Sequence, residues 1–337
     1  MLRGRLYIDG HDAYLTYGVY VVKDGWNELI AYPSLKKPEE NEWFEEDGVE
    51  VDLSDPVLDV KEVQLKVAYG GIYNRFIDFV DMLSDGAYHE FECPSICRKF
   101  RLRLTQMPNL TEIAYLGNVT LKLSNDFPLN GYKYRAPQSS IMVKDDFTID
   151  GRPFTDYGAR ILKGSLSDIK KAPQVKTALL RNIKTKTGVI YDGDAPVFFK
   201  AKDVKLKILM RAETLEELWR NYDALLYDLV RPGERSLGVS LFEQEFPCYY
   251  KSASVTKFYP VGKIWLEFTL TLTFTHDFRL NGDDIVLASE VGDIVFTQDD
   301  VNAIEMRPDR ESWPSIRMVN DRMTIRLMSN GAMRFNN

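Results

Sequence analysis

The feature that most constrains this chain is an internal repeat that keeps its order and spacing. Ile8-Asp9-Gly10 recurs as Ile149-Asp150-Gly151, 141 residues later, and Tyr17-Gly18 recurs as Tyr157-Gly158 after 140 residues. A repeat of this length is long enough to be a whole domain, so it decides the domain organisation before any single motif is considered.

The repeat continues into later parts of the chain. Residues 61–67 match residues 202–208, again 141 apart, and Asp126-Phe127 matches Asp277-Phe278 at a spacing of 151. Chance matches do not keep their order in this way, so the sequence predicts two copies of one domain. The predicted boundaries are 1–131 for the first copy, 132–148 for a linker, 149–282 for the second copy and 283–337 for a short β-rich extension.

Each copy carries the same succession of hydrophobic patterns. Residues 204–208 alternate apolar with charged side chains, and residues 266–274 alternate apolar side chains mainly with threonine, the period of a half-buried strand. Residues 215–229 place apolar side chains three or four apart, which predicts a helix that ends before Pro232-Gly233. A shorter helical pattern lies near 72–83. The sequence therefore predicts a mainly β fold with some α structure (α+β): two tandem antiparallel β-barrel or sandwich domains, each with one packed helix.

Composition excludes several classes of protein. The 337 residues carry 50 acidic and 43 basic side chains, so a general electrostatic grip on nucleic acid is not expected. Apolar runs fall short of the roughly 20 residues that a membrane helix needs, and we expect neither a membrane segment nor a secretion signal. The three cysteines cannot form a disulfide framework, and folding in a cytoplasm is expected.

One equivalent loop differs in charge between the copies. Residues 39–50 of the first copy contain seven acidic side chains, whereas residues 176–192 of the second contain the basic Lys176, Arg181, Lys184 and Lys186. Two solvated loops are one interpretation. The other is that the acidic loop meets the basic loop across a domain or subunit contact, since loops this long in a compact domain usually have a function.

The motifs of common enzymes are missing. The chain has no Gly-x-Ser-x-Gly elbow, no phosphate-binding Gly-x4-Gly-Lys loop and no Gly-x-Gly-x-x-Gly. We therefore predict no catalytic residue, no cofactor and no enzymatic activity.

Two groups of residues could suggest a metal. His89, Cys93 and Cys97 are spaced by four and would share one face of a strand, but structural zinc usually takes four ligands, so ordinary strand packing is preferred. Residues 192–194 and 281–284 contain clustered acids without the continuation of a calcium loop, and polar turns are preferred there. We predict no metal site.

Several segments of the second copy carry a resemblance to a known family. The predicted helix with its ending Arg231-Pro232-Gly233, the segment Pro247-Cys248-Tyr249-Tyr250 and the threonine-rich strand 266–274 resemble the distal tail proteins of tailed phages. The segment 292–318, with Trp313-Pro314, resembles the start of that family's C-terminal β-domain. The resemblance covers most of the second copy and, through the repeat, extends to the first.

This resemblance implies a fold, a function and partners. The family has a tail-tube fold and assembles as a six-fold ring around a DNA channel. This chain departs from it by carrying two such domains, so three chains would supply a ring of six with three-fold symmetry. The implied protein is a structural component of a phage or prophage tail, assembled in the host cytoplasm. It would contact other tail-tube and baseplate proteins, and DNA would pass through it without specific binding.

Two other functions remain open from the residues. A tandem β-domain binding module for carbohydrate or a host surface could use Trp26, Trp43 and Trp313 to stack on sugars, although core or interface aromatics are the preferred interpretation. An enzyme could place its cleft between the two copies, but no nucleophile and base can be paired from the motifs.

Overall fold

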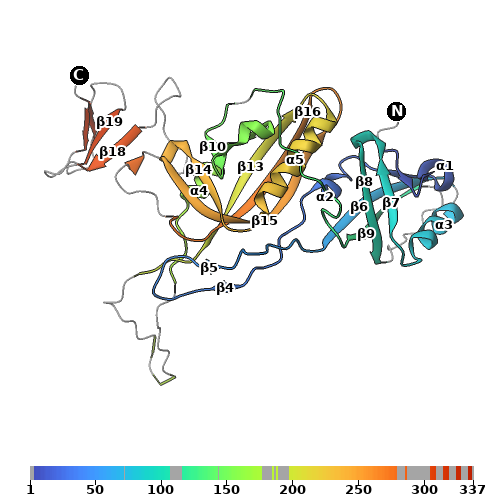
Figure 1. Ribbon diagram of the computed structural model, residues 1–337, viewed down its shortest axis with the longest axis horizontal. Helices are drawn as coiled ribbons and strands as arrows, with labels where there is room; N and C mark the ends of the chain where they lie inside the picture. Colours follow the sequence, from blue (N-terminus) through green and yellow to red (C-terminus); the bar gives the residue numbers. More distant parts are fainter. Residues whose placement is uncertain are drawn as a thin grey trace.

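A computed structural model gives the arrangement of the chain (Figure 1). It describes residues 4–71, 73–106, 116–142, 144–176, 184–185, 187–188 and 197–278, together with the backbone of five later strands. Most of the described elements are strands in curled antiparallel sheets, with few helices, which confirms the prediction of a mainly β protein. We refer to residues 4–131 as the first unit and residues 144–278 as the second unit.

The first unit contains a seven-stranded sheet with the order β2-β1-β7-β8-β9-β6-β3. Its neighbouring strands pair antiparallel. The strands are β1 (Tyr7–Ile8), β2 (His11–Asp12), β3 (Val19–Val21), β6 (Lys61–Gly70), β7 (His89–Cys93), β8 (Arg98–Gln106) and β9 (Leu116–Asn125).

The second unit contains another seven-stranded sheet, with the order β11-β10-β14-β15-β16-β13-β12. The strands are β10 (Phe147–Ile149), β11 (Arg152–Pro153), β12 (Ala159–Ile161), β13 (Lys202–Ala212), β14 (Arg235–Val239), β15 (Gln244–Tyr259) and β16 (Ile264–Phe274). Taken in chain order, each strand holds the place in its sheet that its counterpart holds in the other: β1 and β10, β6 and β13, β8 and β15, β9 and β16.

Strand pairing corrects one spacing inferred from the sequence. Lys61 lies opposite Asn125 and its counterpart Lys202 lies opposite Phe274, so the last strands are 149 residues apart. The Asp-Phe dipeptides, which gave 151, lie in the turns that follow these strands. The turn of the second unit is two residues longer before the dipeptide, and the match there does not report the strand register.

The Ile-Asp-Gly repeat forms a tight turn in both units. Asp9 and Gly10 have φ of 50° and 82°, and Asp150 and Gly151 have φ of 50° and 76°. Two consecutive left-handed residues make the turn that suits a two-residue β-hairpin, and Asp-Gly is a favoured pair for it. Asp9 Oδ1 also accepts the Glu90 N–H, and Asp150 Oδ1 accepts the Ser236 N–H, both from the next strand of the sheet. The motif therefore has a structural role.

One long helix packs on each sheet. These are α3 (Tyr73–Leu83) and α5 (Leu215–Leu229), close to the predicted ranges. Thr214 caps α5, because its Oγ1 accepts the Glu217 N–H at 3.1 Å. Three short helices, α1 (Ala13–Tyr17), α2 (Asn27–Ile30) and α4 (Ser165–Lys170), were not predicted, since a single turn leaves no periodicity to detect.

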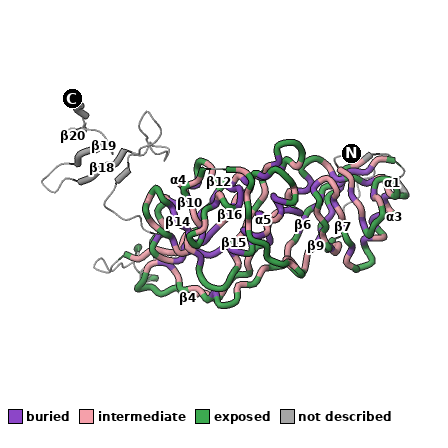
Figure 2. Tube along the Cα trace, turned by 45° about the horizontal axis from the view of Figure 1, so that its top comes forward, coloured by how far each residue is buried: buried purple, intermediate pink, exposed green. Residues whose placement is uncertain are grey.

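The buried apolar residues form one cluster that runs through both sheets and across their junction. Figure 2 shows the buried segments, in purple, along the strands of both units. Beyond them, β17 (Ile285–Val286), β18 (Ile304–Pro308), β19 (Pro314–Met318), β20 (Thr324–Leu327) and β21 (Met333–Phe335) form a five-stranded antiparallel meander. The helices of the described residues are all too short or too polar to cross a membrane.

Candidate assembly surface

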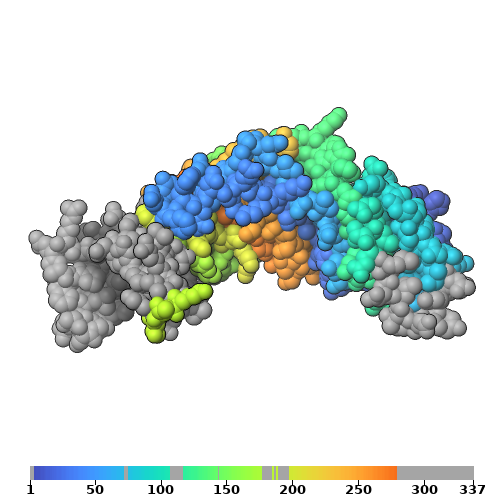
Figure 3. Space-filling view, turned by 90° about the horizontal axis from the view of Figure 1, so that it is seen from below, coloured from blue at the N-terminus to red at the C-terminus, as the bar shows by residue number. Residues whose placement is uncertain are grey.

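A long excursion of the first unit lies across the second. Residues 33–60 leave the sheet after α2 and return to it at β6, and they carry β4 (Glu40–Asn41) and β5 (Glu50–Val51). We call residues 33–60 the arm. Figure 1 shows the arm running beneath the second unit, and Figure 3 shows it in blue against the yellow and orange residues of that unit.

The base of the arm is held by strand β15. The Leu35 N–H donates to the Lys251 carbonyl at 2.9 Å, and the Tyr250 hydroxyl donates to the Pro33 carbonyl at 2.6 Å. Lys251 lies at a β-bulge, where the pairing of β15 with β16 skips from Tyr250 to Ser252. A bulge leaves its extra residue outside the ladder, so its carbonyl is available to the arm.

The tip of the arm is held at the far side of the second unit. The Gly48 N–H donates to the Phe199 carbonyl at 2.7 Å, and the Val49 N–H donates to the Thr275 carbonyl at 2.9 Å. Asp47 Oδ1 accepts the Phe199 N–H at 2.8 Å. Gly48 has φ of 78°, and a Cβ at this position would lie 1.6 Å from the Thr275 carbonyl oxygen, so only glycine fits.

The structure brings the acidic loop of the first copy to the basic loop of the second. Lys176, which is buried, donates from Nζ to the main-chain carbonyl of Trp43 at 2.6 Å. The contact shown is therefore a hydrogen bond to the backbone. Arg181 and Lys186 lie outside the described residues.

Aromatic side chains fill the junction between the units. Tyr32, just before the arm, stacks on Tyr222 of α5 with ring centroids 4.1 Å apart, and each hydroxyl donates to a main-chain carbonyl across the junction. The Trp219 indole N–H donates to the Ile96 carbonyl at 2.7 Å, and the Arg98 guanidinium lies 4.2 Å from the Trp219 ring centroid. Arg98 also pairs with Asp223 on α5 at 2.5 Å. Such satisfied, buried contacts favour a fixed arrangement of the two units.

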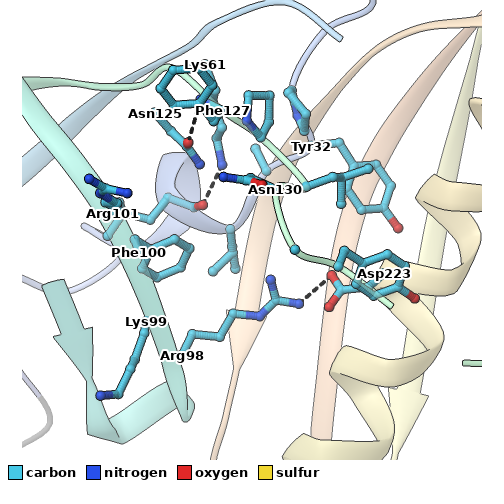
Figure 4. A pocket seen from close by; sticks show the side chains of 18 of the residues that line it. Tyr32, Lys61, Arg98, Lys99, Phe100, Arg101, Asn125, Phe127, Asn130 and Asp223 are labelled. Atoms are coloured by element: carbon cyan, nitrogen blue, oxygen red, sulfur yellow. Dashed lines mark hydrogen bonds and ion pairs between the residues drawn. The ribbon is translucent and has the colours of Figure 1, made fainter. Parts of the chain in front are cut away.

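A cavity of about 720 Å³ lies beside this junction, lined by residues of both units (Figure 4). Its cationic side chains have internal partners: Lys61 donates to the Leu29 carbonyl, Arg98 pairs with Asp223, and Arg101 lies over the Tyr88 ring. The cavity therefore belongs to the junction between the units, and its charges are used within the protein.

Lys61 and its counterpart Lys202 have the same role. Lys61 Nζ donates to the Leu29 carbonyl near the end of α2, and Lys202 donates to the Lys171 carbonyl at the end of α4. Burial lowers the pKa of the Lys61 ammonium to about 7, and the positive Arg98 adds to this effect. Burial also lowers the pKa of Lys202, to about 8. Both lysines are thus structural groups that close short helices.

We expect the contribution of Lys61 to stability to depend on pH. Its pKa is lower in the folded chain than in the unfolded one, so between pH 7 and about 10 the unfolded chain binds more protons. The stability of the native chain relative to Lys61→Met should therefore rise through this range. Urea unfolding of both proteins from pH 6 to pH 10 measures the difference. Parallel stability curves would contradict the assigned environment.

The three residues weighed as zinc ligands are separated by the fold. His89 and Cys93 lie on β7, but Cys97 follows a 3₁₀ turn with φ of 52° and is exposed, so the expectation of one shared strand face is wrong. His89 is buried between Asp9 and Asp85, at 2.6 Å and 3.1 Å. Its counterpart Arg235 binds Asp150 in the same way, at 2.6 Å. His89 therefore secures the Asp-Gly turn.

The other candidate residues are scattered. Trp26 is buried, Trp43 is 56% exposed on the arm, and Trp313 lies outside the described residues, as do 192–194 and 281–284. Within the described part of the chain, no three His, Cys, Asp or Glu side chains are placed to hold a metal ion.

Sequence reasoning missed the aromatic junction and the path of the arm. Only the matched Pro33 and Pro173, which begin the two long loops, and the charge difference between those loops gave a signal. In comparisons with known proteins, no family model and no curated protein matches this chain.

Proposed function

We propose that this chain is a structural protein of a phage or prophage tail tip, with two tail-tube-like domains in tandem. Three chains would form a ring of six such domains that joins the tail tube to the baseplate and lets DNA pass. The proposal rests on the resemblance of the second copy to distal tail proteins. The matching strand order of the two sheets is the observation that carries it further.

The contact between the two units supports the ring. It joins different surfaces: the arm and the α2 region of the first unit meet α5 and β15 of the second. A contact between unlike surfaces of equivalent units can repeat head to tail, and it closes into a ring when the rotation permits. The two-unit chain is thus a model for one step of the ring.

The charge of the chain supports passage of DNA without binding. With 50 acidic and 43 basic side chains, the protein lacks the overall positive charge that would hold the phosphate backbone. The proposed site of action is the virion tail, after assembly in the host cytoplasm, and the proposed partners are neighbouring tail-tube and baseplate proteins.

The proposed ring is tested by native mass and negative-stain images of one sample over a range of concentrations. The proposal predicts a trimer with a central hole wide enough for duplex DNA. A closed trimer without a hole would contradict the conduit. A protein that remains monomeric at the highest concentration reached would contradict self-assembly.

A further inference from the structure

The surface that receives the arm in the second unit has a counterpart in the first. Leu102 lies opposite His89 and Cys248 opposite Arg235, so the registers of β8 and β15 can be aligned. In both strands a bulge follows: the pairing skips Thr105 in β8 and Lys251 in β15. Thr105 therefore occupies the place of Lys251, whose carbonyl accepts the base of the arm.

The second unit has the counterpart of the arm base. Val175 forms an isolated bridge with Phe199, as Leu35 does with Leu58, and the two bridges are related by the spacing of the repeat. Leu35 is half-buried because it lies on β15, whereas Val175 is 54% exposed. The segment that begins at Val175 thus has the form of the arm base without the sheet that would cover it.

A pair of glycines makes the same distinction at the tip. Gly48 and Gly188 are counterparts, with φ of 78° and 86°. A Cβ on Gly48 would strike the Thr275 carbonyl, but nothing lies within 4 Å of the same position on Gly188. Gly188 has the backbone conformation that Gly48 uses to approach another unit, in a setting where no unit is present.

The charges of the two surfaces are complementary. The Val175 segment carries Lys176 and Lys200 near the bridge. On the first unit, the residues that replace Asp203 and Thr275 are Glu62 and Asp126. Glu62 is exposed, and the Arg103 guanidinium holds the pKa of Asp126 at about 2, so both are anionic at neutral pH. A basic segment would therefore meet a surface with additional acidic groups.

We propose that the face of the first unit around Thr105 receives the Val175 segment of a second copy of this chain. The contact would repeat between chains the one seen within the chain, with the Val175 N–H donating to the Thr105 carbonyl as the Leu35 N–H donates to Lys251. This inference rests on the proposed self-assembly and names the surfaces that carry it. It makes the contact heterologous, so successive chains add head to tail.

Cysteine cross-linking between two differently substituted chains tests this contact. Both chains carry Cys97→Ser, since Cys97 is exposed while Cys93 and Cys248 are buried. One chain adds Val175→Cys and the other Thr105→Cys, and the mixture is treated with a short bismaleimide. We expect a linked dimer on a denaturing gel, with the joined peptides identified by mass spectrometry.

Two controls fix the interpretation. A single chain with Leu35→Cys and Lys251→Cys should link within itself and remain monomeric on the gel, since these residues already touch. A chain with Val261→Cys, which is 62% exposed, replaces the Val175→Cys chain in a second mixture. We expect roughly tenfold less dimer from that mixture, because only a bound segment has a raised local concentration.

The outcomes separate this contact from the ring itself. Oligomers that form in solution without the 175–105 link, while the internal control links, would overturn this contact and leave the ring proposal standing. A chain that remains monomeric at every concentration and gives no link would overturn both.

Discussion

Replacing Tyr222 by alanine is expected to lower the free energy of unfolding by about 3–5 kcal/mol, the range for loss of a large buried aromatic. Tyr222 is 1% exposed, stacks on Tyr32 and meets Phe268 edge-on with centroids 5.3 Å apart. Its hydroxyl also donates to the Ile30 carbonyl, which would lose this partner within the junction. Chemical denaturation of the native and variant chains measures the change.

Tyr227 provides the matched control for this substitution. It lies on the same helix, α5, but is 38% exposed. Tyr227→Ala should therefore cost about 1 kcal/mol or less, as surface substitutions usually do. Equal losses in the two variants would contradict the assignment of Tyr222 to the centre of the junction.

Replacing Gly48 by alanine is expected to detach the tip of the arm. The added Cβ cannot fit against the Thr275 carbonyl, so the amide bonds of Gly48 and Val49 should be lost together. At about 1 kcal/mol for each bond plus strain, the tip should open more easily by about 2–3 kcal/mol. Hydrogen exchange at these two amides should then be about 30- to 100-fold faster, since 1.4 kcal/mol is a factor of ten.

Gly188→Ala is the control for the effect of a left-handed glycine. Its φ of 86° imposes a similar backbone strain, but the added Cβ meets nothing within 4 Å. Protection of the Gly48 and Val49 amides should be unchanged in this variant. If Gly48→Ala left exchange at these amides unchanged as well, the close approach of the arm to the second unit would be wrong.

The sequence predicted those parts of the fold that have a local signal. The alternation at 204–208 and 266–274 and the apolar stripe of α5 each act within one element, so their periods are visible in the chain. The role of Asp9 was not visible, because the Glu90 N–H that it accepts comes from a strand about eighty residues away. The same holds for His89, whose metal interpretation came from spacing along the chain alone.

The candidate assembly surface was less accessible to sequence reasoning. Charge indicated that residues 39–50 and 176–192 differ, but not that Gly48 reaches Phe199. Nor does any pattern near Tyr32 indicate its stack on Tyr222, since the two residues belong to different units. Contacts between domains depend on the relative placement of whole surfaces, which no short-range period encodes.

The central claim is that the contact between the two units is repeated between chains. A three-dimensional reconstruction of the assembled protein by electron cryomicroscopy tests it most directly. The account predicts a ring of three chains in which six sheets alternate, with each Val175 segment on the Thr105 face of the next chain and an open channel at the centre. A two-fold contact that joins like surfaces, or a closed particle without a channel, would contradict it.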